Sequence, residues 1–131
     1  MRASWPLRSG RPCIEVVLWR TADGTDYPRV LLADTGAGAA DLDVELILAE
    51  SDCLTCSRRR AGHTSITGAF AGYYSLFEIR VCVPVIGFDQ IIIAAGVRSI
   101  SRNFDGVAGY RFLNRFTFGN FGLRDQFGIE V

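Results

Sequence analysis

Lysine is absent from the sequence, and histidine occurs once, as His63. All of the positive charge is therefore arginine, and the 14 basic residues are balanced by 14 acidic ones. A dedicated nucleic-acid-binding protein carries an excess of positive charge, so we expect no nucleic-acid partner. A Cys-His or Ser-His nucleophilic site would have to use His63. No acidic residue lies near it in the sequence, and a surface histidine at the base of a hairpin is the simpler interpretation.

Long apolar runs are also missing. No stretch is long enough to cross a bilayer, and residues 1–11 lack the apolar centre of a secretion signal. We therefore expect a soluble, cytoplasmic protein without a membrane span, although a domain cut from a longer precursor would look the same. The 131 residues are 49% hydrophobic, enough for one domain with a core and too few for two. We expect a single domain over residues 1–131, with 1–12 as a flexible or dimer-contacting segment.

Cysteine is scarce, with four residues in the chain. Cys53 and Cys56 form a CxxC pair, a spacing used in zinc and thiol redox sites, but one pair supplies only two of four metal ligands. Cys13 and Cys82 lie on expected strands, where a free cysteine is usually a small buried hydrophobe. We expect no metal and no cofactor. A small metal or thiol protein built around the CxxC pair remains an alternative.

Short runs of strand-forming residues dominate the sequence. Asp23-Gly24 is a turn that joins two of them in a hairpin. Residues 41–48 alternate acidic and apolar side chains, the period-two pattern of a strand with one wet face, on which Glu45 lies. Residues 51–61 indicate a polar loop with a solvated arginine run at 58–60. The other expected strands are 13–20, 27–33, the arms of hairpins within 63–83 and 78–95, 116–121 and 127–131.

Glycines mark the hairpin turns in the second half of the chain. The hairpin within 63–83 has a flexible tip of small residues at 68–72, and the next one turns at 87–89. One short helix is expected over residues 109–116, and the aromatic residues from 112 to 127 are expected in the core or in a dimer contact. Many short strands with one late helix predict a mostly-β barrel or sandwich.

Residues 30–38 read VLLADTGAG, so that an apolar run ends by delivering Asp34 into a tight glycine turn. A carboxylate at the mouth of a buried strand, followed by a hydroxyl and a glycine, is costly, and stability alone rarely explains it. The pattern indicates a chemical role for Asp34. An ordinary turn at a strand end is the alternative, because aspartate, threonine and glycine are common turn formers.

The stretch Asp34, Thr35, Gly36, Ala37 resembles the active-site loop of the retropepsin-like aspartic proteases, in which each of two chains contributes one loop. Residues 104–113, FDGVAGYRFL, are similar to the segment of that family in which two apolar residues and a glycine precede the one helix. The order of elements over roughly residues 13–121 fits the family as well. In this comparison, the segment packed beside the catalytic loop is formed by Val107, Ala108 and Gly109.

The resemblance implies a retropepsin-like closed barrel or sandwich with a glycine-tipped flap and one short C-terminal helix. It also implies a homodimeric aspartic endopeptidase, in which Asp34 is the acid and base, Thr35 braces the loops across the dimer, and Gly36 lets the backbone turn close to the carboxylates. The flap would fold over an extended peptide or protein substrate. Its residues would be Gly68, Ala69, Phe70, Ala71 and Gly72.

The chemistry explains why two chains are needed. Peptide hydrolysis without a metal requires one group to take a proton from water while another polarises the carbonyl and later protonates the nitrogen. Two carboxyls about 3 Å apart can do both, because their closeness makes them share one proton, as in aspartic proteases generally. With one Asp-Thr-Gly in these residues, the pair requires a two-fold axis through the site.

Some positions depart from the family pattern. Many members carry a serine, threonine or aspartate where this chain has Gly38-Ala39, and a branched and a charged residue where it has Ala108 and Tyr110. These differences favour, as the alternative function, a catalytically weak or inactive dimerisation or peptide-binding module of the same fold.

Overall fold

The computed structural model describes residues 1–39 and 43–131 and is mostly β, with 54% strand and 13% helix. Its helices are α1 Glu50–Cys56 and α2 Tyr110–Leu113, with 3-10 turns η1 Gly68–Phe70 and η2 Pro84–Ile86. Its strands are β1 Arg2–Pro6, β2 Cys13–Trp19, β3 Asp26–Ala33, β4 Leu46–Ala49, β5 Ser57–Ile66, β6 Gly72–Val83, β7 Phe88–Val97, β8 Gly106–Ala108, β9 Thr117–Gly119 and β10 Gln126–Glu130.

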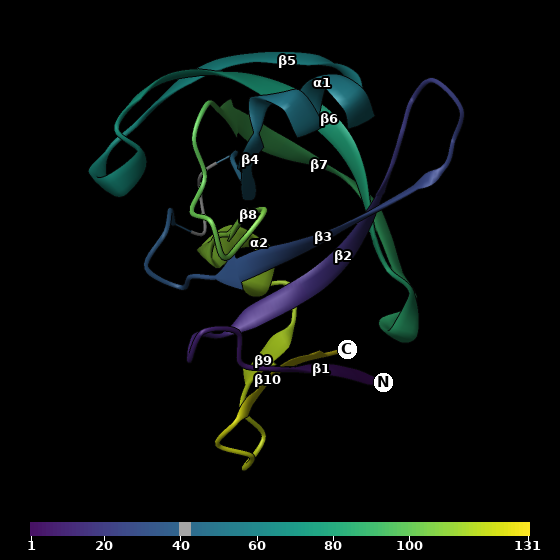
Figure 1. Cartoon of the computed structure of the whole chain (residues 1–131), viewed down its shortest axis with the longest axis vertical. Helices are drawn as coiled ribbons and strands as arrows, with labels where there is room; N and C mark the ends of the chain where they lie inside the picture. The colour runs from purple at the N-terminus through teal and green to yellow at the C-terminus, as the bar shows by residue number, and fades with distance from the viewer. Residues whose placement is uncertain (40–42) are drawn as a thin grey trace.

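Six strands close into a barrel in the order β2-β3-β8-β4-β7-β6, which confirms the expected mostly-β barrel (Figure 1). The ring closes where β6 pairs with β2, at Cys82 and Val17. Strand β5 pairs with β6 outside the ring, and the two arch across one end of the barrel as a long hairpin. Two parallel pairings, β3–β8 and β4–β7, connect segments that are far apart in the sequence.

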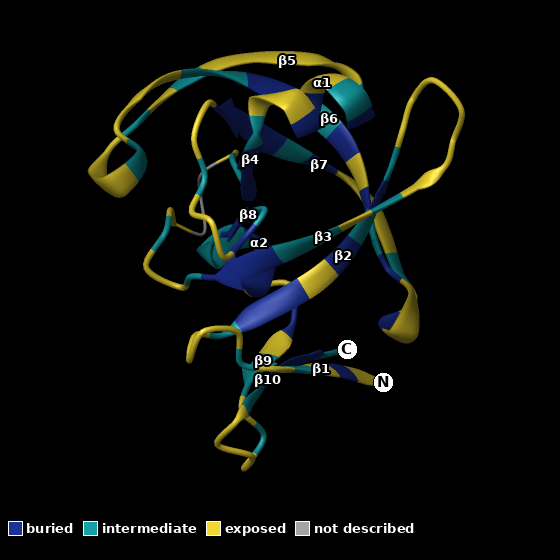
Figure 2. Cartoon of the chain, viewed as in Figure 1, coloured by how far each residue is buried: buried dark blue, intermediate teal, exposed yellow. Residues whose placement is uncertain are grey.

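The core lies inside the ring and is set by strand alternation (Figure 2). On β2, Ile14, Val16 and Leu18 are at most 1% exposed, whereas Glu15 between them is exposed. Alternation of this kind buries one face of a strand and leaves the other wet. A second cluster covers the opposite face of the sheet with Leu32, Ile47, Val97 and other apolar residues. The strands at the centre of the sheet are therefore buried on both faces.

Residues 2–6 form an ordered strand where the sequence predicted a flexible or dimer-contacting segment. Strand β1 pairs with β10 of the same chain from Arg2–Glu130 to Pro6–Gln126, and β9 completes a three-stranded sheet. The buried side chain of Ala3 fixes the strand against the core. The two termini consequently lie side by side.

The expected hairpins are confirmed. Strands β2 and β3 are joined through Asp23-Gly24, with Gly24 at φ +70°. Strands β5 and β6 form the long hairpin that ends at Gly68–Gly72. Strands β6 and β7 form the next one, whose turn runs through Pro84–Ile86 and Gly87, slightly earlier than predicted. Helix α2 and the closing strands β9 and β10 also lie where the sequence predicted them.

Two predictions for residues 42–61 are wrong. Leu46 and Leu48 are buried and Asp43 is exposed, as the alternation predicts, but Glu45 and Ile47 are buried as well, because β4 lies between β7 and β8 and has no wet face. The prediction for residues 41 and 42 lies outside the described residues. The segment predicted as a polar loop contains α1, which buries Cys53 and Cys56 one turn apart on its inner side.

The arginine run lies on a strand, not in a loop. Arg58, Arg59 and Arg60 belong to β5, the outermost strand of the seven-stranded sheet. Arg59 forms an ion pair with Glu78 at 2.8 Å, and two register irregularities interrupt the pairing with β6. Charged side chains and bulges are the features that keep an outer strand from pairing with another chain.

Candidate functional site

Asp34 stands at the end of β3, in a loop whose shape is set by backbone hydrogen bonds. Its N–H donates to the carbonyl of Ala108 at 3.0 Å, and its Oδ1 accepts the N–H of Gly36 at 3.0 Å. The N–H of Ala37 donates to the carbonyl of Asp34 at 3.1 Å. Asp34 is half-buried, and Thr35 and Gly36 are exposed. The carboxylate is thus held by the main chain at an accessible position.

The predicted segment 107–109 lies next to this loop. Strand β8 runs parallel to β3, with Ala108 opposite Ala33, and it delivers Gly109 against the loop. The N–H of Tyr110 donates to the carbonyl of Ala37 at 2.8 Å, and a Cβ on Gly109 would lie only 3.0 Å from that oxygen. The structure therefore brings together two of the three segments that the sequence singled out.

A buried ion pair fixes the chain that follows the loop. Glu45 is 5% exposed, and its carboxylate accepts two hydrogen bonds from Arg115, at 2.6 and 3.0 Å. Arg111 approaches the same carboxylate at 3.5 Å. The carbonyl of Glu45 also accepts the N–H of Gly109 at 3.0 Å. Sequence reasoning missed this pair, because its partners are 70 residues apart and Glu45 was placed on a wet face.

A cavity of about 410 Å³ borders the Asp34 loop. Ala37 and Gly38 of the loop contribute to its wall, and Asp34 itself does not. Residues 63–67 of β5 and the turn after it close the cavity on the hairpin side. Its apolar lining consists of Val44, Ile47, Ile66 and Leu76. The cavity can therefore take apolar side chains beside the loop.

The hairpin tip does not line this cavity. Ala69, Phe70 and Ala71 border a different cavity of about 610 Å³, on the side of residues 96–99. Gly68 and Gly72 have φ values of +85° and +157°, which only glycine adopts easily. The Tyr74 hydroxyl donates to the carbonyl of Ala71 at 3.2 Å. The glycines thus serve the turn, and the structure does not bring residues 68–72 to the cavity at Asp34.

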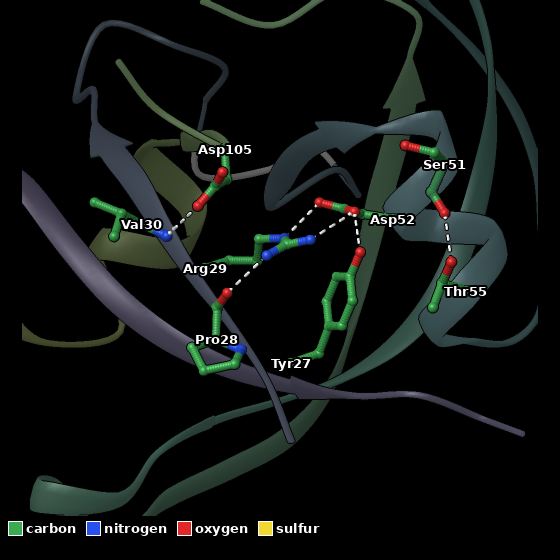
Figure 3. A network of polar contacts seen from close by, with 8 residues as sticks. All are labelled: Tyr27, Pro28, Arg29, Val30, Ser51, Asp52, Thr55 and Asp105. Atoms are coloured by element: carbon green, nitrogen blue, oxygen red, sulfur yellow. Dashed lines mark hydrogen bonds and ion pairs between the residues drawn. The ribbon is translucent and has the colours of Figure 1, made fainter. Parts of the chain in front are cut away.

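A polar network fixes α1 to β3 upstream of the loop (Figure 3). Asp52 is 7% exposed and accepts hydrogen bonds from Arg29 Nε at 2.7 Å, Arg29 Nη2 at 3.0 Å and the Tyr27 hydroxyl at 2.9 Å. On the next residue of β3, the Val30 N–H donates to Asp105 Oδ2 at 2.8 Å. No buried side-chain nitrogen or oxygen of the described residues lacks a hydrogen-bond partner, so the network serves to position the strand that carries Asp34.

The CxxC pair is buried inside α1. Cys53 and Cys56 are 0% and 3% exposed, and burial raises the pKa of Cys53 to about 12 and that of Cys56 to about 11. Thiols of such high pKa are poor nucleophiles and poor metal ligands at neutral pH. Within residues 1–39 and 43–131, no group of three or more histidine, cysteine, aspartate or glutamate side chains could hold a metal ion.

His63 lies on β5 and is exposed, stacked on Tyr73 with ring centroids 5.4 Å apart. The described part of the chain contains no helix that is long and apolar enough to cross a membrane. Comparison of this chain with protein-family models, with curated proteins and with solved structures gave no match.

Proposed function

We propose that this chain is an aspartic endopeptidase of the retropepsin-like type, active as a homodimer. The observation that supports it is the position of Asp34: an accessible carboxylate at the end of a buried strand, held by the Gly36 N–H and braced by Ala108 and Tyr110. A carboxylate fixed by the main chain rather than by a flexible side chain is pre-organised for acid–base work.

In the proposed dimer, the exposed loops of two chains meet across a two-fold axis, so that the two Asp34 carboxyls share one proton. One carboxyl takes a proton from the attacking water while the other donates a hydrogen bond to the peptide carbonyl. The tetrahedral intermediate then collapses as a proton passes to the leaving nitrogen. Thr35, exposed beside Asp34, is the residue proposed to brace the two loops against each other.

The substrate is proposed to be an extended peptide with apolar side chains. The cavity beside the loop is lined by Val44, Ile47, Ile66 and Leu76, which favours an aliphatic or aromatic side chain next to the bond that is cut. The β5–β6 hairpin forms the other wall and is proposed as the flap. Its tip, residues 68–72, would have to move toward Asp34 to cover the substrate.

The test is Asp34→Asn. The amide cannot share a proton as the carboxyl pair does, so we expect peptide cleavage at acidic to mildly acidic pH to fall by about a thousandfold or more. Fold and dimerisation, followed by circular dichroism and sedimentation, should stay as in the wild type. Asp125→Asn, an exposed aspartate away from the loop, is the matched control and should cleave normally. Persistent turnover by Asp34→Asn would refute the proposal.

A second candidate is a peptide-binding or dimerisation module with little or no hydrolysis. It is favoured by the sparse support of the carboxylate, which receives one hydrogen bond from the described residues, the Gly36 N–H. Gly38 and Ala39 add no hydroxyl that could provide another. Peptide binding by the wild-type dimer, without cut products over long incubation and across the acidic range, would select this alternative.

A further inference from the structure

Strands β6 and β7 part from each other at a defined point, and the space between them is the larger cavity. Their ladder ends with Leu76 opposite Ala95. Beyond that pair, β6 continues with β5 as a separate hairpin, whereas Gly96 and Val97 stay with β4. The fork between the two branches holds the cavity of about 610 Å³. Its volume lies in the range of sites for small ligands.

Aromatic side chains line the hairpin branch of this fork. Tyr73 stacks in parallel on His63 at an interplanar angle of 7°. Phe70 and Tyr74 also line the cavity, and Tyr74, the next residue of β6, projects from the opposite face of the strand to Tyr73. Tyr73 is 71% exposed, which is unusual for so large a side chain at the wall of a cavity. The hairpin therefore offers ring faces on which a ligand ring can stack.

The opposite branch presents two charges of opposite sign. Ala49 and Val97 are paired on neighbouring parallel strands, and Glu50 and Arg98 are the residues that follow them at this end of the ladder. Both line the fork, yet in residues 1–39 and 43–131 neither forms an ion pair with the other or with any third residue. Adjacent charges that do not neutralise each other are available to a ligand that carries both signs.

We propose that the fork binds an aromatic zwitterion of amino-acid or dipeptide size. The ligand's carboxylate pairs with Arg98, its ammonium pairs with Glu50, and its ring lies against Tyr73. Opposite charges close together on one wall and ring faces on the other match the layout of a free aromatic amino acid. The proposal is independent of the peptidase function.

The hairpin is shared by the two cavities. It lines the larger cavity with residues of its tip and closes the smaller one through residues 63–67, and His63 lines both.

The experiment is a titration with three probes, followed by calorimetry and by amide NMR shifts: L-phenylalanine, N-acetyl-L-phenylalanine and L-phenylalanine amide. We expect saturable binding of phenylalanine, with the largest shifts at Gly96, Ser99 and Tyr73. Each capped probe lacks one charge and should bind about fivefold more weakly, the size of a solvent-exposed ion pair. Saturation without shifts at the fork, or with shifts centred on residues 37–47, would overturn the proposal.

Two variants test which protein charge pairs with which charged group of the ligand. Glu50→Gln should abolish the preference for phenylalanine over the N-acetyl probe and keep the preference over the amide; Arg98→Gln should do the opposite. Arg124→Gln, an exposed arginine outside the fork, should keep both preferences. Unchanged preferences in Glu50→Gln and Arg98→Gln would refute the assignment. Because binding is measured without catalysis, and can be repeated in Asp34→Asn, its failure is distinguishable from failure of the peptidase proposal.

Discussion

Single residues decide how firmly the strand that carries Asp34 is held, and Asp52 is the clearest case. Asp52→Asn removes the carboxylate that accepts two hydrogen bonds from Arg29. The Arg29 side chain, which is 23% exposed, then lacks its charge partner. Removing one member of a buried pair costs more than the pair itself contributes, because the remaining charge stays desolvated. We expect a loss of about 2 kcal/mol in the free energy of unfolding, measured by urea denaturation.

The matched control is Asp89→Asn. Asp89 receives a similar two-point contact from Arg80, at 2.9 and 2.7 Å, but both side chains are exposed. Water screens such a pair and solvates the arginine that is left, so little stability should be lost. Equal losses in the two variants would show that burial of the Asp52 pair is not what fixes α1 to β3.

The buried thiols predict how stability changes with pH. The pKa of Cys53 is raised from 9.0 to about 12 in the folded protein, so its contribution is complete below pH 9 and is lost as the pH rises toward 12. In that window the unfolded chain has released the proton and the folded chain has kept it. Stability should fall by about 1 kcal/mol per pH unit more steeply in the wild type than in Cys53→Ala.

The measurement for this prediction is urea unfolding of both proteins at several pH values between 8 and 11. Cys82→Ala is the control, because Cys82 is only half-buried and should change the slope less. Parallel stability curves for the wild type and Cys53→Ala would contradict the prediction.

At the scale of elements, β8 is the piece that joins the Asp34 loop to the barrel, and Gly106 allows it to fit. A Cβ at Gly106 would meet the carbonyl of Ile47, and would lie 2.9 Å from Leu48 Cδ2 and 3.1 Å from Leu31 Cδ2. The backbone of a central strand cannot shift without disturbing its neighbours. Gly106→Ala should therefore lower the free energy of unfolding, measured by urea denaturation, by about 3 kcal/mol.

Gly122→Ala provides the comparison for Gly106→Ala. Gly122 has φ +84° with nothing within 4 Å of an added Cβ, so only backbone strain applies. That strain should cost about 1 kcal/mol. A cost at Gly106 no greater than at Gly122 would mean that β8 shifts freely, and that the loop is not tightly fixed by it.

The elements that the sequence predicts correctly are those whose signals are local. The β2–β3 hairpin has strand formers on both sides of Asp23-Gly24, and the turn is set by Gly24 at φ +70°. Helix α1 was missed because its apolar side is only two cysteines wide. The rest of its support comes from distant strands, for example through the contacts of Asp52 with Tyr27 and Arg29 of β3, 25 and 23 residues away. No local pattern contains that information.

The candidate site also combines local features, which the sequence can predict, with long-range contacts, which it cannot. The turn at Asp34 follows from a local pattern, a strand that ends in a glycine turn. Its main-chain hydrogen bonds to residues 107–109 come from a parallel pairing of distant segments, which the sequence indicated only through the resemblance to retropepsin-like proteases. The Glu45–Arg115 pair reverses the alternation that predicted a wet face, because burial on β4 depends on which strands flank it. Pairing across 70 residues is a property of the assembled barrel.

At the scale of the whole molecule, the proposed chemistry requires two chains, because the sequence carries one Asp-Thr-Gly. If each active site uses one Asp34 from each subunit, a chain with Asp34→Asn must inactivate any wild-type partner. When the chains pair at random, an equal amount of the variant places about half of the wild-type chains in mixed dimers. Activity per wild-type chain should fall to about half, and with a fourfold excess to about one fifth.

The mixing experiment is done by unfolding the two chains together, refolding them, and measuring peptide cleavage at a fixed concentration of wild-type chain. Asp125→Asn chains, which cleave normally, should raise total cleavage in proportion to the number of chains added when they are mixed in the same way, and this controls for refolding yield and crowding of the assay. A shared carboxyl pair makes inhibition by Asp34→Asn depend on the mixing ratio, whereas a site complete within one subunit is unaffected by an inactive partner. Activity per wild-type chain that stays constant as Asp34→Asn chains are added would therefore refute the two-chain site, even if the single variant were inactive.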